Sequence, residues 1–215
     1  MKKLIVEFIG TFFLVFTIGG AVASGSVIAP VAIGAVLMVM VYAGGHISGA
    51  HYNPAVSLAV LIRGKISAVL MIQYWIAQLL GGLVGALFSH FVTGNNASVV
   101  MGPGLNISPA TSVLAEALGT FALAYVVLNV ATATATAGNS FYGLAIGFTV
   151  MSMAVAIGGI SGGAFNPAVG IGRNFADELV GAGKSISNVW IYVVGPLIGG
   201  ALAGIVFKTL NTETI

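Results

Sequence analysis

The sequence predicts an all-α membrane protein in which six transmembrane helices and two re-entrant half-helices form an inverted repeat. Three observations lead to this fold class. The chain is too apolar to build a water-soluble surface, and it contains six apolar segments long enough to cross a bilayer. It also carries the tripeptide Asn-Pro-Ala twice, each time shortly after a Ser-Gly pair.

The composition requires lipid around most of the chain. Of the 215 residues, 58% are hydrophobic and 6% are charged, and the mean hydropathy is +1.09. A soluble domain carries roughly 25% charged residues, so this chain cannot form a solvated shell. No Asp, Glu, Lys or Arg occurs between Glu7 and Arg63, between Lys65 and Glu116, or between Glu116 and Arg173. Each gap has room for two spans of about 20 residues.

The same composition excludes several functional classes. Seven basic residues and a net charge of +2 are too little for a nucleic-acid surface. Without cysteine there are no disulfides or thiolate metal sites, and the three histidines lack a metal-binding spacing. No nucleophile–base pair can be assembled from these residues, so we expect neither an enzyme nor a bound cofactor.

The first helix begins close to the N-terminus. Its start resembles a secretory signal, with Lys2 and Lys3 before an apolar run and a cleavage-like Ala21-Val22-Ala23. Glu7 interrupts that run, however, and the run is long enough to span the bilayer by itself. We therefore expect a retained helix, with cleavage as the alternative.

The apolar segments define the remaining elements. Spans are predicted at residues 4–24, 31–50, 68–92, 111–131, 141–160 and 188–208. Two further segments, 53–62 and 166–176, begin at Asn-Pro, where asparagine is a preferred N-cap and proline suits the first helical position. A helix of about 10 residues is about 15 Å long, half of a bilayer core of about 30 Å. We expect these two segments to be half-helices.

The chain contains an internal repeat within one domain of residues 1–215. "EFIGTFFLVF" from Glu7 matches "EALGTFALAY" from Glu116, "SGAHYNPAV" from Ser48 matches "SGGAFNPAV" from Ser161, and Trp75 matches Trp190. The two halves, 1–95 and 110–215, are joined by an outer loop and hold three spans each. An odd number of spans makes the second half cross the membrane in the opposite sense.

The orientation follows from the basic residues beside the spans. If the N-terminus is cytoplasmic, five basic residues lie inside and two outside, which is the expected bias. The inner ones are Lys2, Lys3, Arg63, Lys65 and Lys208, and the outer ones are Arg173 and Lys184. We expect a multi-pass protein of the cell membrane with both termini cytoplasmic, and Trp75 and Trp190 at the lipid boundary.

Two half-helices of opposite direction would meet N-terminus to N-terminus near the membrane midplane. Irregular backbone at that depth is tolerated only where protein buries it or water lines it. The loops would offer carbonyl groups to a passing molecule, and the asparagines amide hydrogens. Each helix start adds about half a positive charge, which repels cations and protons. The pattern predicts a narrow pore for small uncharged polar molecules, built on Asn53, Pro54, Ala55, Asn166, Pro167 and Ala168.

These motifs together resemble those of the aquaporin or major intrinsic protein family. The resemblance runs from "EFIGTFFLVF" through "GGHISGAHYNPAVSLA" and "SGGAFNPAVG" to "WIYVVGPLIGGALAG", nearly the whole chain. It implies a homotetramer in membrane lipid with one pore per subunit, cytoplasmic termini and passive flow of small neutral solutes.

Three ionisable residues accompany the predicted half-helices. Glu7 and Glu116 occupy equivalent places in the two halves, and a buried carboxylate is costly unless it is hydrogen-bonded. We expect both to accept hydrogen bonds from the re-entrant loops and so hold the loop carbonyls in place, rather than to relay protons. His51 lies two residues before Asn53, where the resemblance implies a position near the pore. A structural or pore-lining role is favoured over pH gating.

The residue after the second Asn-Pro-Ala departs from the family pattern. Most family members carry Arg there, as part of a narrow outer filter, whereas this chain has Val169. By resemblance the other filter positions fall on Ile33, Ala154 and Gly163. Such a filter has no charge and little bulk, so it is expected to be wider and more apolar than in a strict water channel. Arg173 lies about two turns beyond Asn166 and is not an obvious replacement.

We therefore predict a passive channel for water and small neutral solutes that excludes ions and protons. A wider, apolar filter could pass glycerol, urea, ammonia, hydrogen peroxide or dissolved gases alongside water. By resemblance, glycerol-selective relatives carry Asp soon after the second motif, whereas this chain has Gly170, so the motif signatures do not settle the solute. One alternative is a coupled secondary transporter, which would need a sodium or proton gradient. The other is a non-conducting membrane scaffold.

Overall fold

A computed structural model describes residues 1–211, so the last part of the predicted second half, 212–215, lies outside the described residues. Six helices are long and apolar enough to cross a membrane, which confirms the six predicted spans. They are α1 (Lys2–Ala23), α2 (Ala29–Ser48), α4 (Ala68–Thr93), α5 (Pro109–Thr132), α6 (Tyr142–Ser161) and α8 (Val189–Leu210). Residues 1–211 contain no β-strand.

Two shorter helices begin at the Asn-Pro motifs. They are α3 (Pro54–Arg63) and α7 (Pro167–Val180), and single-turn helices η1 (Asn96–Ser98), η2 (Thr134–Thr136) and η3 (Ile186–Asn188) lie in the connections. Helix α7 is longer than the predicted 166–176, because the prediction stopped where the apolar run meets Asp177 and Glu178. Charged residues end an apolar pattern, but they do not end a helix.

Most long helices are delimited by standard capping residues. Ser67 and Ser108 accept backbone hydrogen bonds from Leu70 and Thr111 at the starts of α4 and α5. Gly49 and Gly162 end α2 and α6 at φ values of 90° and 95°, in the left-handed conformation that glycine adopts without a steric penalty. Each of these glycines turns the chain into the loop before a half-helix.

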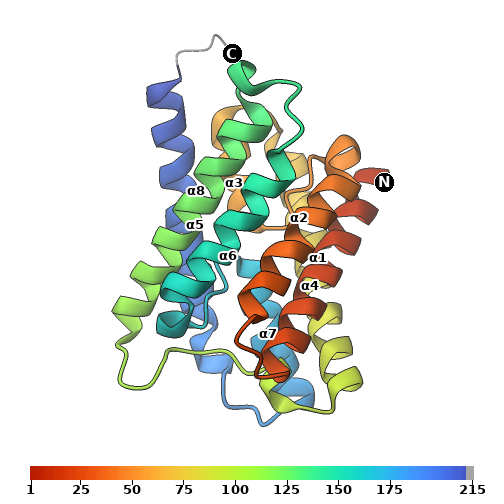
Figure 1. The fold of residues 1–215 in the computed structure, drawn as a ribbon, viewed down its shortest axis with the longest axis vertical. Helices are drawn as coiled ribbons and strands as arrows, with labels where there is room; N and C mark the ends of the chain where they lie inside the picture. The colour runs from red at the N-terminus through yellow and green to blue at the C-terminus, as the bar shows by residue number, and fades with distance from the viewer. Residues whose placement is uncertain (212–215) are drawn as a thin grey trace.

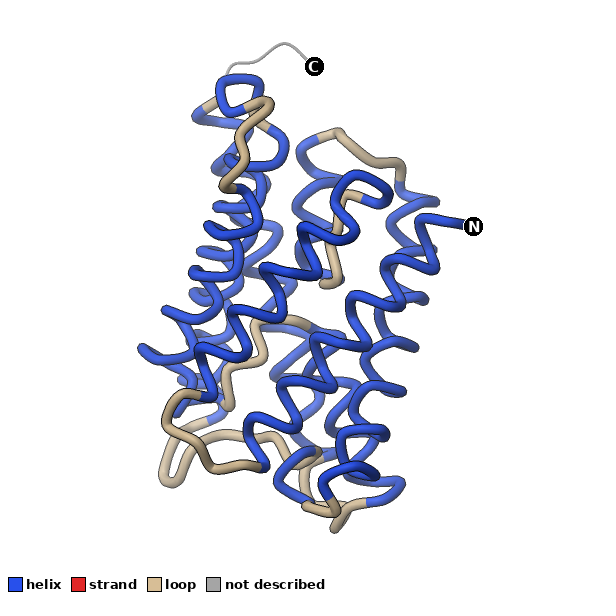
Figure 2. Tube along the Cα trace, turned by 45° about the vertical axis from the view of Figure 1, so that its right-hand side comes forward, coloured by secondary structure: helices blue, strands red, loops and turns tan. Residues whose placement is uncertain are grey.

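The helices form one bundle with the half-helices inside it. The N-terminus and the C-terminal end of α8 lie at the same end of the bundle (Figure 1). Helix α3 occupies the half of the bundle nearest that end, and α7 occupies the opposite half. The loops before them run through the interior of the bundle (Figure 2). This is the arrangement expected of an inverted repeat.

Each half-helix packs against a long helix of the other half of the chain. Gly82 of α4 touches the backbone of Ala168 in α7, and Gly200 of α8 touches the backbone of Ala55 in α3. A Cβ atom at either glycine would collide with the facing carbonyl oxygen. Glycine therefore permits the close backbone approach that places both Asn-Pro-Ala motifs in the centre of the bundle.

The outer surface of the bundle is suited to lipid. Each long helix exposes large apolar side chains, among them Phe13, Val39, Ile76, Leu118, Phe148 and Ile198. Exposed apolar surface on every long helix is unfavourable in water and favourable in a bilayer core. The protein is therefore an integral, multi-pass membrane protein.

Candidate pore

The loop between α2 and α3 is held by the carboxylate of Glu7. This carboxylate is buried in α1 and accepts hydrogen bonds from the backbone N–H groups of His51 (3.0 Å) and Tyr52 (2.7 Å). The hydroxyl of Ser48 (2.7 Å) and the side-chain amide of Gln78 (2.8 Å) donate two more. Four donors offset the cost of burying the group.

Glu116 of α5 holds the loop between α6 and α7 in the same manner. Its buried carboxylate accepts hydrogen bonds from the N–H groups of Ala164 (2.9 Å) and Phe165 (2.6 Å) and from the hydroxyl of Ser161 (2.6 Å). These three donors stand at the positions equivalent to Ser48, His51 and Tyr52. The equivalent glutamates therefore make equivalent hydrogen bonds, and Gln78 is an addition of the first half.

The residue before each asparagine adopts a strained backbone conformation. Tyr52 and Phe165 have φ values of 50° and 48°, in the left-handed region that L-residues rarely occupy. Each ring packs directly on a glycine, Gly10 in α1 for Tyr52 and Gly119 in α5 for Phe165. Such backbone persists only where its surroundings impose it, and here the glutamate hydrogen bonds and the ring packing do so together.

Asn53 and Asn166 link the two half-helices. Their side-chain oxygens accept from the N–H groups of Ala55 and Ala168 at 2.9 Å, so each asparagine caps its own helix. The amide of Asn53 donates to the carbonyl oxygen of Phe165 at 2.8 Å, and the amide of Asn166 donates to that of Tyr52 at 2.9 Å. Each amide has two hydrogens, so one remains for a molecule in the centre of the bundle.

Both asparagines line a narrow central cavity. Its volume is about 20 Å³, measured as the space open to the centre of a water molecule; one water needs roughly 10–15 Å³ on that measure. The walls come from α1, α2, α3, α5, α6 and α7, and most are aliphatic: Leu14, Ile18, Ile33, Leu37, Val56, Leu123, Val127, Ile146, Val150 and Val169. The polar groups in this cavity are thus concentrated at the re-entrant loops and the two asparagines.

Three of the four predicted filter positions lie on this cavity. Ile33, Gly163 and Val169 are among its lining residues, together with the asparagines. Ala154 is not. It follows Ile146 and Val150 at four-residue steps on α6, so it lies on the same helical stripe, one turn beyond the part of the wall that these two form.

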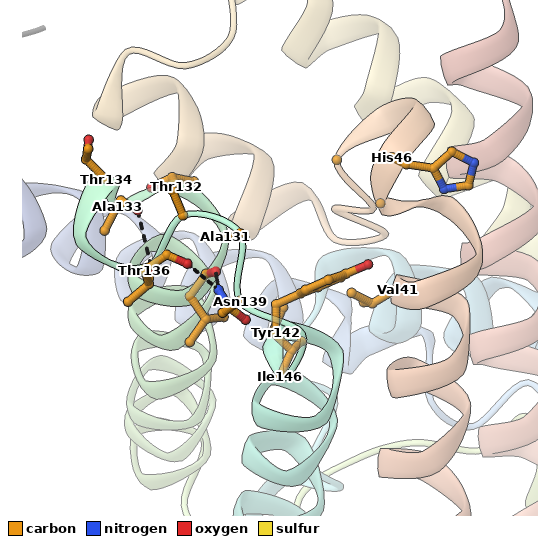
Figure 3. A pocket seen from close by; sticks show the side chains of 15 residues that line it. Val41, His46, Ala131, Thr132, Ala133, Thr134, Thr136, Asn139, Tyr142 and Ile146 are labelled. Carbon is orange, nitrogen blue, oxygen red and sulfur yellow. Dashed lines mark hydrogen bonds between the residues drawn. The ribbon is translucent and has the colours of Figure 1, made fainter.

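A larger cavity opens at the end of the bundle that holds the N-terminus and the C-terminal end of α8. Its volume is about 550 Å³, and it is enclosed by α2, the end of α5, the start of α6 and the connection between them (Figure 3). Thr132, Thr134 and Thr136 are among its lining residues. The amide of Asn139 donates to the carbonyls of Val130 (2.7 Å) and Thr136 (2.6 Å), which folds the connection over the cavity rim. We call this space the inner cavity, and this end of the bundle the inner end, after the orientation predicted from the basic residues.

His51 lies between the central cavity and the inner end of the bundle. It lines the central cavity and also a neighbouring space of about 450 Å³ that includes Lys3, Lys65 and Tyr74. Its Nδ1 atom lies 3.0 Å from the hydroxyl of Ser57, and its ring packs edge-on against Tyr74. The imidazole is therefore held in place at the inner end of the narrow region.

Another cavity, the outer cavity, opens at the opposite end. Its volume is about 430 Å³, and its walls come from the connection after η1, the loop after α7, and the ends of α1 and α6. Two basic residues, Arg173 and Lys184, line it. The central cavity thus lies between wider spaces at both ends of the bundle.

Several supporting residues were not predicted. The indole N–H of Trp75 donates to the carbonyl of Pro54 at 2.9 Å, a contact at the start of α3 rather than the predicted lipid-boundary position. Gln78 donates to Glu7 and Ser57, and the hydroxyl of Tyr74 donates to the carbonyl of Ser48 at 2.6 Å. In the sequence, these residues could have been found as polar groups inside the long apolar segment 68–92, where a polar side chain needs a hydrogen-bond partner.

Comparison with known proteins agrees with this architecture. The family described as "Major intrinsic protein" matches residues 1–207. "Probable aquaporin TIP2-2" from rice (Oryza sativa subsp. japonica) is 37% identical, over 97% of this chain and 86% of its own. "Aquaporin TIP2-3" from Arabidopsis thaliana is 37% identical, over 96% and 86%.

A solved structure shares the fold. The X-ray structure of the aquaglyceroporin from Plasmodium falciparum superimposes with a TM-score of 0.87 and covers 97% of this chain and 96% of its own, at 23% sequence identity. The family match and the relatives support a passive channel for water and small solutes, and they do not favour a coupled transporter or a non-conducting scaffold. The chain belongs to the major intrinsic protein family.

Proposed function

We propose that this channel passes water and the smallest neutral solutes through a single narrow pore and excludes ions and protons. The observation that carries the proposal is the central cavity, where two asparagine amides and the re-entrant loops supply the polar groups of a mostly aliphatic wall. A molecule there finds side-chain hydrogen-bonding groups on the two asparagines and on His51 of the first re-entrant loop. Its volume of about 20 Å³ ranks water and ammonia ahead of urea and glycerol.

The asparagines act as donors in this proposal. The side-chain oxygens of Asn53 and Asn166 accept hydrogen bonds from the helix starts, and the second N–H of each amide is the group offered to a solute. A water molecule between them therefore presents its oxygen to the amides and its hydrogens to its neighbours along the pore. The half-helix starts of α3 and α7 add partial positive charge at the same place, which disfavours cations and hydronium.

The glutamates support the loops in this proposal. Glu7 and Glu116 hold the backbone N–H groups of the re-entrant loops, which leaves loop carbonyls free to replace part of the hydration shell of a solute. Pro54, Ala55, Pro167 and Ala168 define the helix starts that the asparagines cap. His51 closes the inner side of the narrow region as an uncharged hydrogen-bonding group.

The filter is proposed to be apolar. Ile33, Ala154, Gly163 and Val169 offer neither charge nor a side-chain donor, so a solute that passes them gives up hydration without compensation from these side chains. Solutes with weak hydration, such as ammonia and dissolved gases, lose less than urea or glycerol. Hydrogen peroxide, which resembles water in size, belongs with the permeant group.

The assembly and location follow the family. We propose a homotetramer in the cell membrane with one pore per subunit, embedded through the apolar side chains on the long helices. Both termini are placed in the cytoplasm, which puts Lys3, Arg63 and Lys65 on the inner side and Arg173 on the outer side. No nucleic acid or cofactor takes part.

The proposal is tested with purified protein in proteoliposomes. Stopped-flow light scattering compares water, ammonia, urea and glycerol in vesicles with and without protein. Water and ammonia are expected to equilibrate much faster than in empty vesicles, with urea and glycerol slower, and without any sodium or proton gradient. Uptake that requires such a gradient would establish a coupled transporter, and shrinkage no faster than empty vesicles would establish a scaffold.

A matched pair of variants on α6 locates the pore. Val150 lines the central cavity, whereas Val155 is 71% exposed on the outside of the same helix. Val150→Phe is expected to block most water flow, and Val155→Phe to leave it unchanged. Equal effects of the two variants would place the water path elsewhere.

A further inference from the structure

Arg173 lies on the pore-facing side of α7. Asn166 and Val169 line the central cavity, and Arg173 follows them at steps of three and four residues, which keeps all three on one face of the helix. Arg173 lines the outer cavity. Consecutive residues line the two cavities, Gly162 the outer one and Gly163 the central one. The face of α7 that lines the pore therefore carries a basic residue at its outer part.

Within residues 1–211, the buried side chain of Arg173 has backbone carbonyls and no carboxylate as hydrogen-bond partners. Its side chain is 2% exposed and donates to the carbonyl oxygens of Ala97 (2.9 Å), Ser98 (3.0 Å) and Val100 (3.0 Å). Carbonyl groups satisfy the donors but leave the net charge in place. A guanidinium keeps its charge even when it is buried, so its field extends into the adjoining cavity.

The other charges at this end leave the outer cavity electropositive. Lys184 is the second basic residue on its wall, whereas neither Asp177 nor Glu178 is among the lining residues. The carboxylate of Asp177 is directed at the loop after α7, where it accepts hydrogen bonds from Ala182, Lys184 and Ser185. Its negative charge is thus used to fold that loop.

We propose that Arg173 is a cation-excluding residue of this pore that acts from the outer cavity, one helical turn beyond Val169, in addition to the half-helix starts at the centre. Four residues of helix place it about 6 Å further outward along α7. Lys184 strengthens the same field from the rim. This inference rests on the proposed function as an ion-excluding pore, and it assigns the barrier that an apolar filter cannot supply.

The same residue positions the outer wall. Its three carbonyl partners lie on the connection around η1, and Val100, Met101, Gly102 and Pro103 of that connection line the outer cavity. An ion barrier and a wall anchor make different predictions. The barrier depends on charge alone, whereas the anchor depends on the number and direction of the N–H donors.

Two substitutions separate these roles. Arg173→Lys keeps the charge and loses most of the hydrogen bonds, and Arg173→Gln keeps a donor and loses the charge. Proton and sodium leak is measured in proteoliposomes with entrapped pH- and sodium-sensitive dyes, beside water permeability in the same vesicles. We expect about a tenfold higher leak for Arg173→Gln, no increase for Arg173→Lys, and water permeability that changes by less than about twofold.

Variants at exposed lysines keep the test decisive if a substitution at the buried Arg173 prevents folding. Lys184→Glu places an acid on the outer cavity wall, and Lys208→Glu makes the same charge change on an exposed residue of α8 that is not on that wall. Leak is expected to rise for Lys184→Glu and to stay at the wild-type level for Lys208→Glu.

The outcomes are distinct. An unchanged leak in Arg173→Gln, or equal leaks in Arg173→Gln and Arg173→Lys, overturns the proposal, as does an unchanged leak in Lys184→Glu when the Arg173 variants do not fold. Wild-type vesicles without water permeability would instead refute the proposed function itself.

Discussion

Asn53 and Asn166 each donate a hydrogen bond to the carbonyl oxygen of the residue that precedes the other, at 2.8 Å to Phe165 and 2.9 Å to Tyr52. The exchange joins two loops from opposite halves of the chain. Because each asparagine also caps its own half-helix, a single side chain sets both the start of its helix and the distance to the opposite one. The centre of the pore is therefore one cooperative hydrogen-bonded unit.

Asn166→Ala is predicted to destabilise the protein. It removes the N-cap of α7 and the hydrogen bond to Tyr52, and these contribute about 1 kcal/mol each. We expect a lower thermal unfolding midpoint in detergent and a loss of water permeability. Asn129→Ala is the control, because Asn129 donates only to the carbonyl of Tyr125 within its own helix. Similar shifts for both variants would contradict the role of the exchange.

Gly82→Ala is predicted to separate α4 from α7. The added methyl group would collide with the carbonyl of Ala168, and overpacking of this kind typically costs about 1–3 kcal/mol. Gly20→Ala is the matched control on α1, because a Cβ there meets nothing within 4 Å. The thermal midpoint should fall for the first variant and hold or rise for the second. A Gly82→Ala protein as stable as the wild type would show that this contact is not tight.

Val169→Arg is predicted to narrow the filter. A long charged side chain on the wall of a 20 Å³ cavity leaves less room and adds donors. We expect the residual glycerol and urea fluxes to fall by about tenfold and the water flux by about threefold at most, so that the added discrimination is at least roughly threefold, or about 0.7 kcal/mol. Stopped-flow measurements with Val169→Ile as the apolar control check this. Equal reduction of all solutes would count against the assigned filter.

The stability of the loop after α7, residues 181–188, is predicted to fall in acid because of Asp177. Burial of the Asp177 carboxylate favours its neutral form, but hydrogen bonds from Ser185, Ala182 and Lys184 outweigh this and lower the pKa. A lowered pKa stabilises the folded loop above the ordinary Asp pKa of about 3.9, and that stability is lost as the pH falls through the folded value. The resistance of this loop to proteolysis should therefore be constant from about pH 8 to 5 and decline below about pH 4.

Limited proteolysis at the 181–188 connection across this pH range provides the measurement. Asp177→Asn removes the titrating group, so its loop should be less protected at neutral pH and show no further decline in acid. Glu178→Gln is the control, because Glu178 is exposed and its neighbour carries the hydrogen bonds. A wild-type loop that loosens near neutral pH would contradict the lowered pKa.

Much of this architecture is a local property of the chain. Continuous apolar runs determine the six spans, because a bilayer accepts only helices that satisfy their own backbone groups. The Asn-Pro pairs determine where α3 and α7 begin, since cap and first-turn preferences act over a few residues. The repeat even pointed to Glu7 and Glu116, because equivalent surroundings demand equivalent partners.

The remaining features needed the tertiary structure. The Asn53–Phe165 and Asn166–Tyr52 pairs join residues more than a hundred positions apart, and no local pattern specifies which carbonyl an amide meets. Trp75 is equally suited to a lipid boundary by composition, and only packing carries its N–H to Pro54.

The sequence alone therefore determined an inverted pair of half-helices within six spans, because hydropathy and helix capping depend on residues that are close together in the chain. Only the tertiary structure decided that Arg173 meets the carbonyls of Ala97, Ser98 and Val100, and that Ala154 lies beyond the central cavity wall. Side-chain direction depends on how neighbouring helices rotate and approach one another, and that is a property of the whole bundle.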